Sequence, residues 1–358
     1  MTLFEILLRN WNVLQRKRLH RCLIYSWEVI LSVLADYFVF GKNKIAQLSF
    51  VAPNSEILSG SGAWSTVSTV VPEITNKFTK ILAVGMTEEE FPSSLFVKAR
   101  FQENPRASIS PSHFIPITEL TNRHFIGYPM IQRDENPQKI TAEEAWILGR
   151  YVASGRISCL NEVPMVEFYL ANRKSCERIH SYVADFKTTN TKRKKIYCRI
   201  FSDRLVSLCQ KCGSMTNRHY IPAFIMQLPK TLLMCFVNGF LDRAEKLSDY
   251  QVCIRGYEVA FAMQLLMSRL HSVPFLLSAF KHWQVPLKEV QQGKLYTLYG
   301  SVPSRPMAKA FMDEEAVWLP VRSITNDEKQ RKDSFCHLYL SDSSSYVLNG
   351  IIVRSKGM

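Results

Sequence analysis

The sequence lacks the cysteine spacing that a disulfide framework or a zinc site requires. Its nine cysteines are irregularly spaced over 358 residues, and the one close pair, Cys209 and Cys212, has no second pair at ligand spacing. Irregular spacing favours free thiols in a reducing compartment, and a structural zinc site takes four ligands. We therefore expect two ordinary thiols and an intracellular protein, in the cytoplasm or in the nucleoid or nucleus of its host cell.

The sequence also lacks an uninterrupted apolar run of membrane-spanning length. Residues 22–41 follow a basic stretch, but Glu28 and Asp36 interrupt them, and each charge is costly at the centre of a bilayer. No cleavage site of small residues follows this segment. The sequence therefore predicts neither a signal peptide nor a membrane anchor, and we expect a protein that is not secreted and has no membrane partner.

Acidic residues are scarce relative to basic ones. Lys and Arg total 45 and Asp and Glu total 31, which gives a formal net charge of +14. This balance makes nucleic acid, or another anionic surface, the leading class of partner. The hydrophobic content of 47% is that of a globular protein, and the length suffices for two or three domains.

The first 140 residues change from a helical to a strand pattern. Apolar residues three and four apart over residues 2–40 predict one or two helices. Gly41 opens a turn, and residues 45–51 predict a short strand. From residue 51 to about 140, short alternating apolar segments separated by Ser, Gly and Pro are typical of an all-β region.

A helical pattern begins at Thr141. Thr141 and Glu144 have the spacing of a capping box, and a second helix follows Pro229. The segments 141–215 and 228–298 look like a repeat of one unit. After about residue 300 the strand pattern returns, so the sequence predicts a β module that is interrupted by an α/β module.

Four stretches, in order along the chain, resemble the sequence blocks of one family. They are residues 51–70, 107–117, the helix pair at 146–155 and 236–245, and 335–355, the last with the sequence FCHLYLSDSSSYVLNGIIVRS. Residues 51–358 therefore resemble an intein, a Hint splicing domain into which a LAGLIDADG homing endonuclease is inserted.

This resemblance implies an α+β fold. An all-β Hint domain, shaped as a horseshoe, would be interrupted by a pseudo-twofold αββαββα LAGLIDADG (DOD-type) endonuclease domain and preceded by a short helical segment. A chain that carries both endonuclease halves is expected to be a monomer. The expected boundaries are 1–49 for the helical N-terminal segment, 50–140 and 299–358 for the two parts of the Hint domain, and 141–298 for the endonuclease domain, with halves at 141–215 and 228–298.

Residues 34–50 bear a faint likeness to the segment that follows the ATP-binding loop of phage terminase large subunits. No G-x-x-x-x-G-K-[ST] motif precedes them, so no ATPase activity is expected. This segment is either a remnant of a host protein or a helical cap on the neighbouring module.

Most positions that match the splicing residues of the family carry other side chains. Splicing begins with a Cys or Ser nucleophile, whereas Phe50 and Val51 stand at the matching place. The helper histidine is matched by His113, which is a candidate catalytic residue or a structural histidine. The penultimate His is replaced by Arg354 and the terminal Asn by Ser355. The resemblance therefore implies the Hint fold but argues against splicing.

The carboxylates of the LAGLIDADG motifs are replaced as well. In that family one carboxylate from each of two closely packed helices binds divalent metal across the scissile phosphates. Ser154 and Ala244 occupy the matching positions. Asp242 is a shifted candidate for a catalytic and metal-binding carboxylate, and Glu245 is a poorer one, although either is also an ordinary helix-end charge. Mg²⁺ or Mn²⁺ is the implied cofactor if any nuclease activity remains.

Duplex DNA is the partner that the resemblance implies. Each endonuclease half would lay a β-sheet into the major groove, where basic side chains contact phosphates and base edges. The alternative is a solvated basic loop. The candidate DNA-binding residues are Lys187, Lys192, Arg193, Lys194, Lys195, Arg199, Arg204, Lys211, Arg218 and Arg255.

Three hypotheses follow. The first is an intein-derived protein that binds double-stranded DNA, does not splice, and has impaired or lost cleavage. The second is an active, free-standing, site-specific endonuclease that uses a shifted carboxylate such as Asp242. The third is a Hint-like structural remnant that does not bind DNA. Salt-sensitive duplex binding separates the first two hypotheses from the third, and metal-dependent cleavage separates the second from the first.

Overall fold

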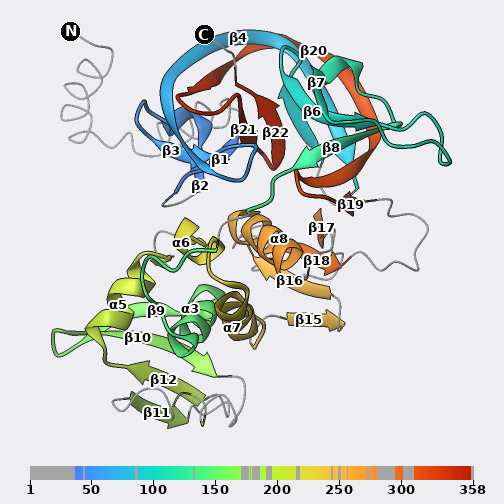
Figure 1. Ribbon diagram of the computed structural model, residues 1–358. Coiled ribbons are helices and arrows are strands. Elements are labelled where there is room, and N and C mark those ends of the chain that lie inside the picture. Colours follow the sequence, from blue (N-terminus) through green and yellow to red (C-terminus); the bar gives the residue numbers. More distant parts are fainter. Residues whose placement is uncertain are drawn as a thin grey trace, which may run out of the picture.

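The protein has an α+β fold, in which a large antiparallel sheet and a smaller helix-and-sheet unit alternate along the chain (Figure 1). The computed structural model describes residues 37–355 apart from internal gaps at 43–44, 85–87, 132–133, 171–176, 178, 180–185, 191–195, 215–217, 243–244, 249–250, 256, 272–274, 280–294 and 301–309. Within the described residues, no helix combines the length and the apolar composition that crossing a bilayer requires.

The β module is formed by the two ends of the described chain. Its main sheet has the order β2-β1-β21-β22-β6-β8-β20-β4-β3, and β5, β7 and β19 pair with β4, β6 and β20. Its strands are β1 (Phe38–Phe40), β2 (Ile45–Gln47), β3 (Glu56–Leu58), β4 (Trp64–Ala83), β5 (Glu89–Pro92), β6 (Phe96–Phe101), β7 (His113–Pro116), β8 (His124–Tyr128), β19 (Phe311–Met312), β20 (Val317–Leu340), β21 (Ser345–Leu348) and β22 (Ile351–Arg354); two short 3-10 helices span Leu48–Phe50 and Ile117–Glu119.

Two long strands give this module its curved outline. β4 and β20 run antiparallel along most of their length, from the pair Val67 and Leu340 to the pair Ala83 and Val321. Register shifts at three places in this ladder bend the two strands, because a bulge adds twist to the strand that carries it. Figure 1 shows β4 and β20 arching together over the rest of the module.

The structure corrects the helix that the sequence predicts up to residue 40. Residues 38–40 form β1, in which Val39 pairs with Leu348 of β21, while Asn349 accepts a hydrogen bond from the Phe38 amide at 2.7 Å. The apolar run Tyr37–Phe40 is too short to distinguish the helical from the strand period, and its aromatic and β-branched residues favour a strand. The other residues of the predicted helical segment, 1–36, lie outside the described residues.

The α/β unit lies between β8 and β19. Its two four-stranded sheets have the orders β9-β10-β12-β11 and β15-β16-β18-β17, so the order of strands is the same when each sheet is read from its first strand. Its elements are α3 (Ala142–Ser154), β9 (Arg156–Leu160), β10 (Val163–Leu170), β11 (Phe186–Asn190), β12 (Ile196–Ile200), α5 (Asp203–Gln210), β13 (Gly213–Ser214), β14 (Arg218–His219), α6 (Ala223–Met226), α7 (Lys230–Leu241), β15 (Glu245–Ser248), β16 (Gln251–Arg255), α8 (Tyr257–His271), β17 (Phe275–Ala279) and β18 (Leu295–Gly300).

The two predicted helix starts are confirmed. Thr141 accepts a hydrogen bond from the Glu144 amide and Glu144 accepts one from the Thr141 amide, which is the reciprocal capping box expected from the sequence. α7 begins at Lys230, directly after Pro229. Pro is suited to this boundary because its fixed φ and missing amide hydrogen cost nothing in the first turn of a helix.

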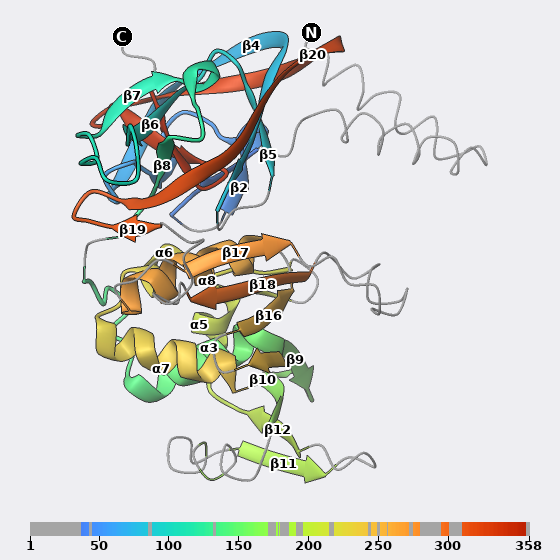
Figure 2. The same cartoon turned by 90° about the vertical axis from the view of Figure 1, so that its right-hand side faces the viewer.

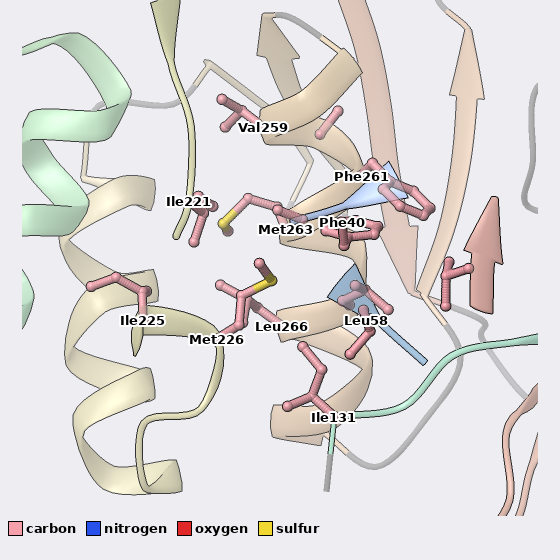
Figure 3. Packing of buried hydrophobic residues seen from close by; sticks show 14 of the residues in the cluster. Phe40, Leu58, Ile131, Ile221, Ile225, Met226, Val259, Phe261, Met263 and Leu266 are labelled. Atoms are coloured by element: carbon pink, nitrogen blue, oxygen red, sulfur yellow. The ribbon is translucent and has the colours of Figure 1, made fainter. Parts of the chain in front are cut away.

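One continuous hydrophobic core joins the β module to the α/β unit. α8 carries Phe261 against Phe40 of β1, with ring centroids 4.5 Å apart, and Figure 3 shows both rings beside Leu58. Tyr128 of β8 meets the same ring edge-on and donates a hydrogen bond of 2.9 Å to Gln264. The β module and the α/β unit therefore share packing rather than being joined only by linkers.

Candidate functional site

The candidate site is built on the crossing of α3 and α7, which lie side by side in Figures 1 and 2. A Cβ atom on Gly149 would overlap the carbonyl oxygen of Phe236, and a Cβ atom on Gly239 would overlap that of Trp146. Each helix therefore lies against the backbone of the other, an approach that only glycine permits.

The two glycine contacts are related by a single shift along the sequence. Gly149 and Gly239 are 90 residues apart, and so are Trp146 and Phe236. Gly149 of α3 meets the carbonyl of Phe236, and Gly239 of α7 meets the carbonyl of Trp146, so the two contacts are equivalent. This relation, together with the shared strand order of the two sheets, makes the helix pair pseudo-twofold.

The C-terminal ends of α3 and α7 carry the positions at which the resemblance implies metal-binding carboxylates. Ser154 is the last residue of α3, and its hydroxyl is buried without a hydrogen-bond partner within the described residues. Ala244 lies outside the described residues. Asp242 is the C-cap of α7 and stands 3.5 Å, measured from its Oδ2 atom, from the Nε atom of Arg150.

Arg150 is fully buried within this helix pair. Its Nη2 atom donates a hydrogen bond to the Tyr169 carbonyl of β10, and its guanidinium lies 5.9 Å from the centre of the Phe168 ring. A buried cation needs an opposite charge and hydrogen-bond acceptors, because desolvation alone would make it costly. Asp242 supplies the opposite charge and the Tyr169 carbonyl accepts one hydrogen bond, so the Asp242 carboxylate faces the Arg150 guanidinium.

These residues do not fit a divalent cation. Mg²⁺ takes oxygen ligands, usually from one or two carboxylates, whereas the described end of the helix pair offers one carboxylate that already faces a guanidinium and one serine hydroxyl. No group of three or more His, Cys, Asp or Glu side chains gathers at metal-binding distance anywhere in the part of the chain that the structure describes. Glu245 begins β15, where it pairs with Cys253.

A charged row crosses the first sheet. Arg156 of β9, Glu167 of β10, Arg199 of β12 and Lys187 of β11 stand side by side in the strand register. Glu167 accepts hydrogen bonds from Arg156 Nε at 2.7 Å and from Arg199 Nε at 3.0 Å, and the carboxylate is buried between the two arginines. The row therefore holds two guanidinium groups at fixed positions around one carboxylate.

The row faces away from the helices. Val166 and Phe168 of β10 are buried and pair with the buried Ile200 and Cys198 of β12, on the face that contacts Arg150 of α3. Because side chains alternate along a strand, Glu167 and its neighbours across the sheet lie on the opposite face. Arg156 and Arg199 are 54% and 33% exposed there, so this face presents positive charge to solvent.

Two other predicted DNA-binding residues have local structural contacts. Arg204 of α5 donates to Glu144 at 2.5 Å and to the carbonyl of Lys139 at 3.1 Å, and the hydrogen bond with Glu144 raises the pKa of Arg204. Lys211 donates a hydrogen bond to Gln138. Both residues therefore connect α5 to the start of α3, beside the sheet rather than on its outer face.

The remaining predicted DNA-binding residues are placed by the backbone or lie outside the described residues. Arg218 is in the short strand β14, and Arg255 is the last residue of β16. Lys192, Arg193, Lys194 and Lys195 lie outside the described residues.

The positions that match the splicing residues lie in the β module. His113 starts β7 at an exposed position, and its Nδ1 atom stands 3.3 Å from the Pro111 carbonyl. Ser355 is buried, and its hydroxyl donates to the Leu338 carbonyl at 2.9 Å. Arg354 is exposed at the end of β22. The Ser355 hydroxyl thus completes a backbone contact at the position where the resemblance implies a terminal Asn.

Sequence reasoning did not single out Arg150, Arg156 or Glu167. The available signal for Arg150 was a charge within the apolar stretch of a helix, next to a glycine that packs against another helix. For Arg156 and Glu167 the signal was weaker, because the strand register that brings them together cannot be read from residue order.

Comparisons with known proteins give a limited result. No family model matches the sequence, and no curated protein matches it. Among solved structures, the chain is similar to the homing endonuclease I-WcaI bound to its DNA recognition sequence, with a TM-score of 0.31 and 11% identity over 46% of this chain and 79% of that chain.

Proposed function

We propose that this chain is a duplex DNA-binding protein built on the two-helix, two-sheet plan of a LAGLIDADG homing endonuclease, held within a Hint-like β module, and that it neither splices nor cleaves. The observation that carries the proposal is the pseudo-twofold crossing of α3 and α7 at Gly149 and Gly239. Such a crossing sets two sheets of equal strand order beside each other, as a protein that reads two neighbouring half-sites requires.

The outer face of the first sheet supports the choice of partner. Arg156 and Arg199 present guanidinium groups that Glu167 holds in place, and the chain carries a net charge of +14. The major groove of B-DNA admits a β-ribbon, and arginine is suited both to phosphate oxygens and to the edge of guanine. The sheet face therefore carries charge of the sign that a duplex requires.

The side chains at the helix ends support the loss of cleavage. Metal-assisted phosphodiester hydrolysis needs carboxylates that hold the cation. Ser154 and Ala244 stand where the family has those carboxylates, and Asp242 faces Arg150. Loss of splicing is supported in the same way, because Val51 and Ser355 replace the nucleophile and the cyclising amide.

The β module supports the Hint part of the proposal. Its two segments, before and after the α/β unit, share one sheet, with β4 and β20 paired along their length. An insertion between two strands of a β module leaves the host sheet intact only if its ends lie close together. β8 and β19 both pair with Val317 and Trp318 of β20, one on each side, so the two ends of the insertion are one strand apart.

Salt-dependent binding tests the proposal. The affinity of the full chain for a randomised duplex library is measured from about 50 to 300 mM KCl; log K is expected to fall linearly with log salt, by about 0.9 per phosphate contacted. Uncut bound duplex in Mg²⁺ and Mn²⁺ is expected, as is one full-length protein band on expression. Weak duplex binding whose affinity does not change with salt concentration would contradict the proposal.

A further inference from the structure

We infer that Arg150 is an internal cation that closes the former metal centre, so that this chain binds duplex DNA without any divalent ion. The inference rests on the proposed function and deepens it, because it states that the DNA-binding site needs no divalent cation. It is carried by the ion pair between Arg150 and Asp242 and by the burial of the Arg150 side chain.

The pair breaks the pseudo-twofold relation of the two helices. The shift of 90 residues that relates the glycines takes Arg150 to Phe240 and Val152 to Asp242. Phe240 and Val152 are both buried apolar residues. α3 therefore carries a cation, Arg150, at a position that is apolar in α7. α7 carries an anion, Asp242, at a position that is apolar in α3, and the two charges face each other across the interface between the helices.

The charges balance without help from a bound ion. Arg150 and Asp242 contribute one positive and one negative charge, and Arg150 also donates to the Tyr169 carbonyl. A divalent cation placed beside Asp242 would meet the guanidinium at short range within a buried site, where repulsion between like charges is strong. Metal binding is thus opposed by a fixed charge as well as by the loss of carboxylates at Ser154 and Ala244.

A consequence follows for DNA. Two unpaired carboxylates at the floor of a DNA-binding surface would repel phosphates unless metal neutralised them. In this chain the one described carboxylate at the helix ends is already neutralised by Arg150, so duplex affinity needs no metal. At constant ionic strength, Mg²⁺ or Mn²⁺ is therefore expected not to raise the affinity above its value in EDTA.

Mn²⁺ binding to the full chain provides the first test. Free Mn²⁺ is followed by its electron paramagnetic resonance signal as protein is titrated, and the melting temperature is recorded with and without millimolar Mn²⁺. We expect no loss of free Mn²⁺ signal in the sub-millimolar range and no shift of the melting temperature. Stoichiometric Mn²⁺ uptake with a raised melting temperature would overturn the inference.

Variants that exploit the broken symmetry provide the second test. Arg150→Phe and Asp242→Val each copy the residue found at the equivalent position of the other helix. Asp242→Val leaves the buried Arg150 charge without this partner, and Arg150→Phe leaves the partly buried Asp242 charge without it. Each single variant should lower the melting temperature by several degrees, whereas the double variant should recover most of the loss. Losses that simply add in the double variant would overturn the claim that the two residues form a pair.

The two tests separate this inference from the proposed function. Duplex binding that is salt-dependent but rises tenfold or more on adding Mg²⁺ at constant ionic strength would overturn the inference and leave DNA binding in place. If the chain binds no duplex, the proposed function is wrong. If it also takes up no Mn²⁺ and the effects of the Arg150 and Asp242 variants are not additive, the claim that Arg150 closes the metal centre still holds.

Discussion

At the scale of single residues, two glycines determine how closely α3 and α7 approach each other. Gly149 and Gly239 each lie against a backbone carbonyl of the opposite helix. Their side-chain hydrogens are the only groups that fit, so the distance between α3 and α7 is set by residue identity at two positions. The relative placement of the two sheets therefore depends on these two residues.

Substitution of either glycine should be strongly destabilising. Gly149→Ala or Gly239→Ala forces the helices apart, and we expect a loss of about 3 kcal/mol in the free energy of unfolding, measured by urea denaturation. Met234→Ala is the matched control, because Met234 lies exposed on α7, and it should change stability by less than about 0.5 kcal/mol. Equal effects of the glycine and control variants would contradict the close crossing.

His219 should make the protein less stable in mild acid. Burial lowers the pKa of His219 below its usual value, an effect that a backbone hydrogen bond with Gly155 only partly offsets. The unfolded chain then binds more protons than the folded chain as pH falls below about 6.5, so the contribution of His219 is present above that pH and is lost as pH falls toward the folded pKa. The free energy of unfolding of His219→Gln should change less between pH 7 and pH 5 than that of the original chain; an unchanged slope would contradict this assignment.

The cysteine pair illustrates what composition can and cannot predict. Cys209 and Cys212 are free thiols, as expected, and both are buried. Burial raises the pKa of each thiol above its usual value, so the reactive thiolate is scarce. Their spacing gave the expectation of two ordinary thiols, but the sequence held no sign of how deeply the pair is buried.

Thiol labelling with a maleimide should follow burial. Cys159 is exposed on β9, and we expect it to react at least tenfold faster than Cys209 or Cys212 in the folded protein. Mass spectrometry of partially labelled chain measures the order of modification. Labelling of Cys209 or Cys212 before Cys159, in the absence of denaturant, would contradict the described packing of α5.

At the scale of elements, strand register determines which side chains meet on the outer face of the first sheet, the face that we propose binds DNA. Arg156 and Arg199 come from β9 and β12 and meet at Glu167 of the strand between them. Neither the spacing nor the composition of these strands fixes which residues stand opposite each other. The sequence predicted Arg199 as a DNA contact. It did not predict that Arg199 stands beside Glu167 and across from Arg156, because only the strand register of the folded sheet brings these residues together.

Removing the two guanidinium groups should reduce the salt dependence of DNA binding. The variant Arg156→Gln/Arg199→Gln is expected to weaken duplex affinity and to reduce the magnitude of the slope of log K against log salt by about 2. The matched control is Arg106→Gln/Arg123→Gln, which removes two exposed arginines from loops of the β module. Equal loss of slope in both double variants would show that the sheet face has no special part in binding.

The elements that sequence patterns predicted well are those with local signals. The capping box at Thr141 and the proline at 229 mark helix starts through contacts within one turn, and both helices begin there. β1 was missed because its three residues, Phe38–Phe40, are apolar throughout, so their pattern does not separate a strand from a helix. The strand state comes from pairing with β2 over all three residues and with β21 at Val39.

At the scale of the whole molecule, the β module and the α/β unit share their packing. Phe261 of α8 contacts Phe40 and Tyr128 of the β module, and a Cβ atom on Gly350 would clash with the same ring. Such packing suggests that the two parts unfold together. The sequence predicted a β module that is interrupted by an α/β module, and in the structure the two parts share one hydrophobic core.

Truncation of Phe261 should therefore affect the entire chain. Phe261→Ala is expected to lower the free energy of unfolding by about 3–5 kcal/mol, because it removes a buried aromatic ring and leaves a cavity. Intrinsic fluorescence and far-ultraviolet circular dichroism should still give coincident transitions. Phe96→Ala, at an exposed position of β6, is the control and should have a small effect; separate transitions for the two parts of the original chain would contradict the shared core.

The most direct test of the central claim is a single binding and cleavage measurement on the purified full chain. A randomised duplex library is incubated with the protein in EDTA, Mg²⁺ or Mn²⁺ at constant ionic strength, and bound and cut fractions are sequenced. The account predicts enriched sequences that are bound in EDTA, are bound no more tightly in Mg²⁺ or Mn²⁺, and are not cut. Metal-dependent double-strand breaks at the enriched sequences would contradict it, and would mean that the ends of α3 and α7 still hold a working metal centre.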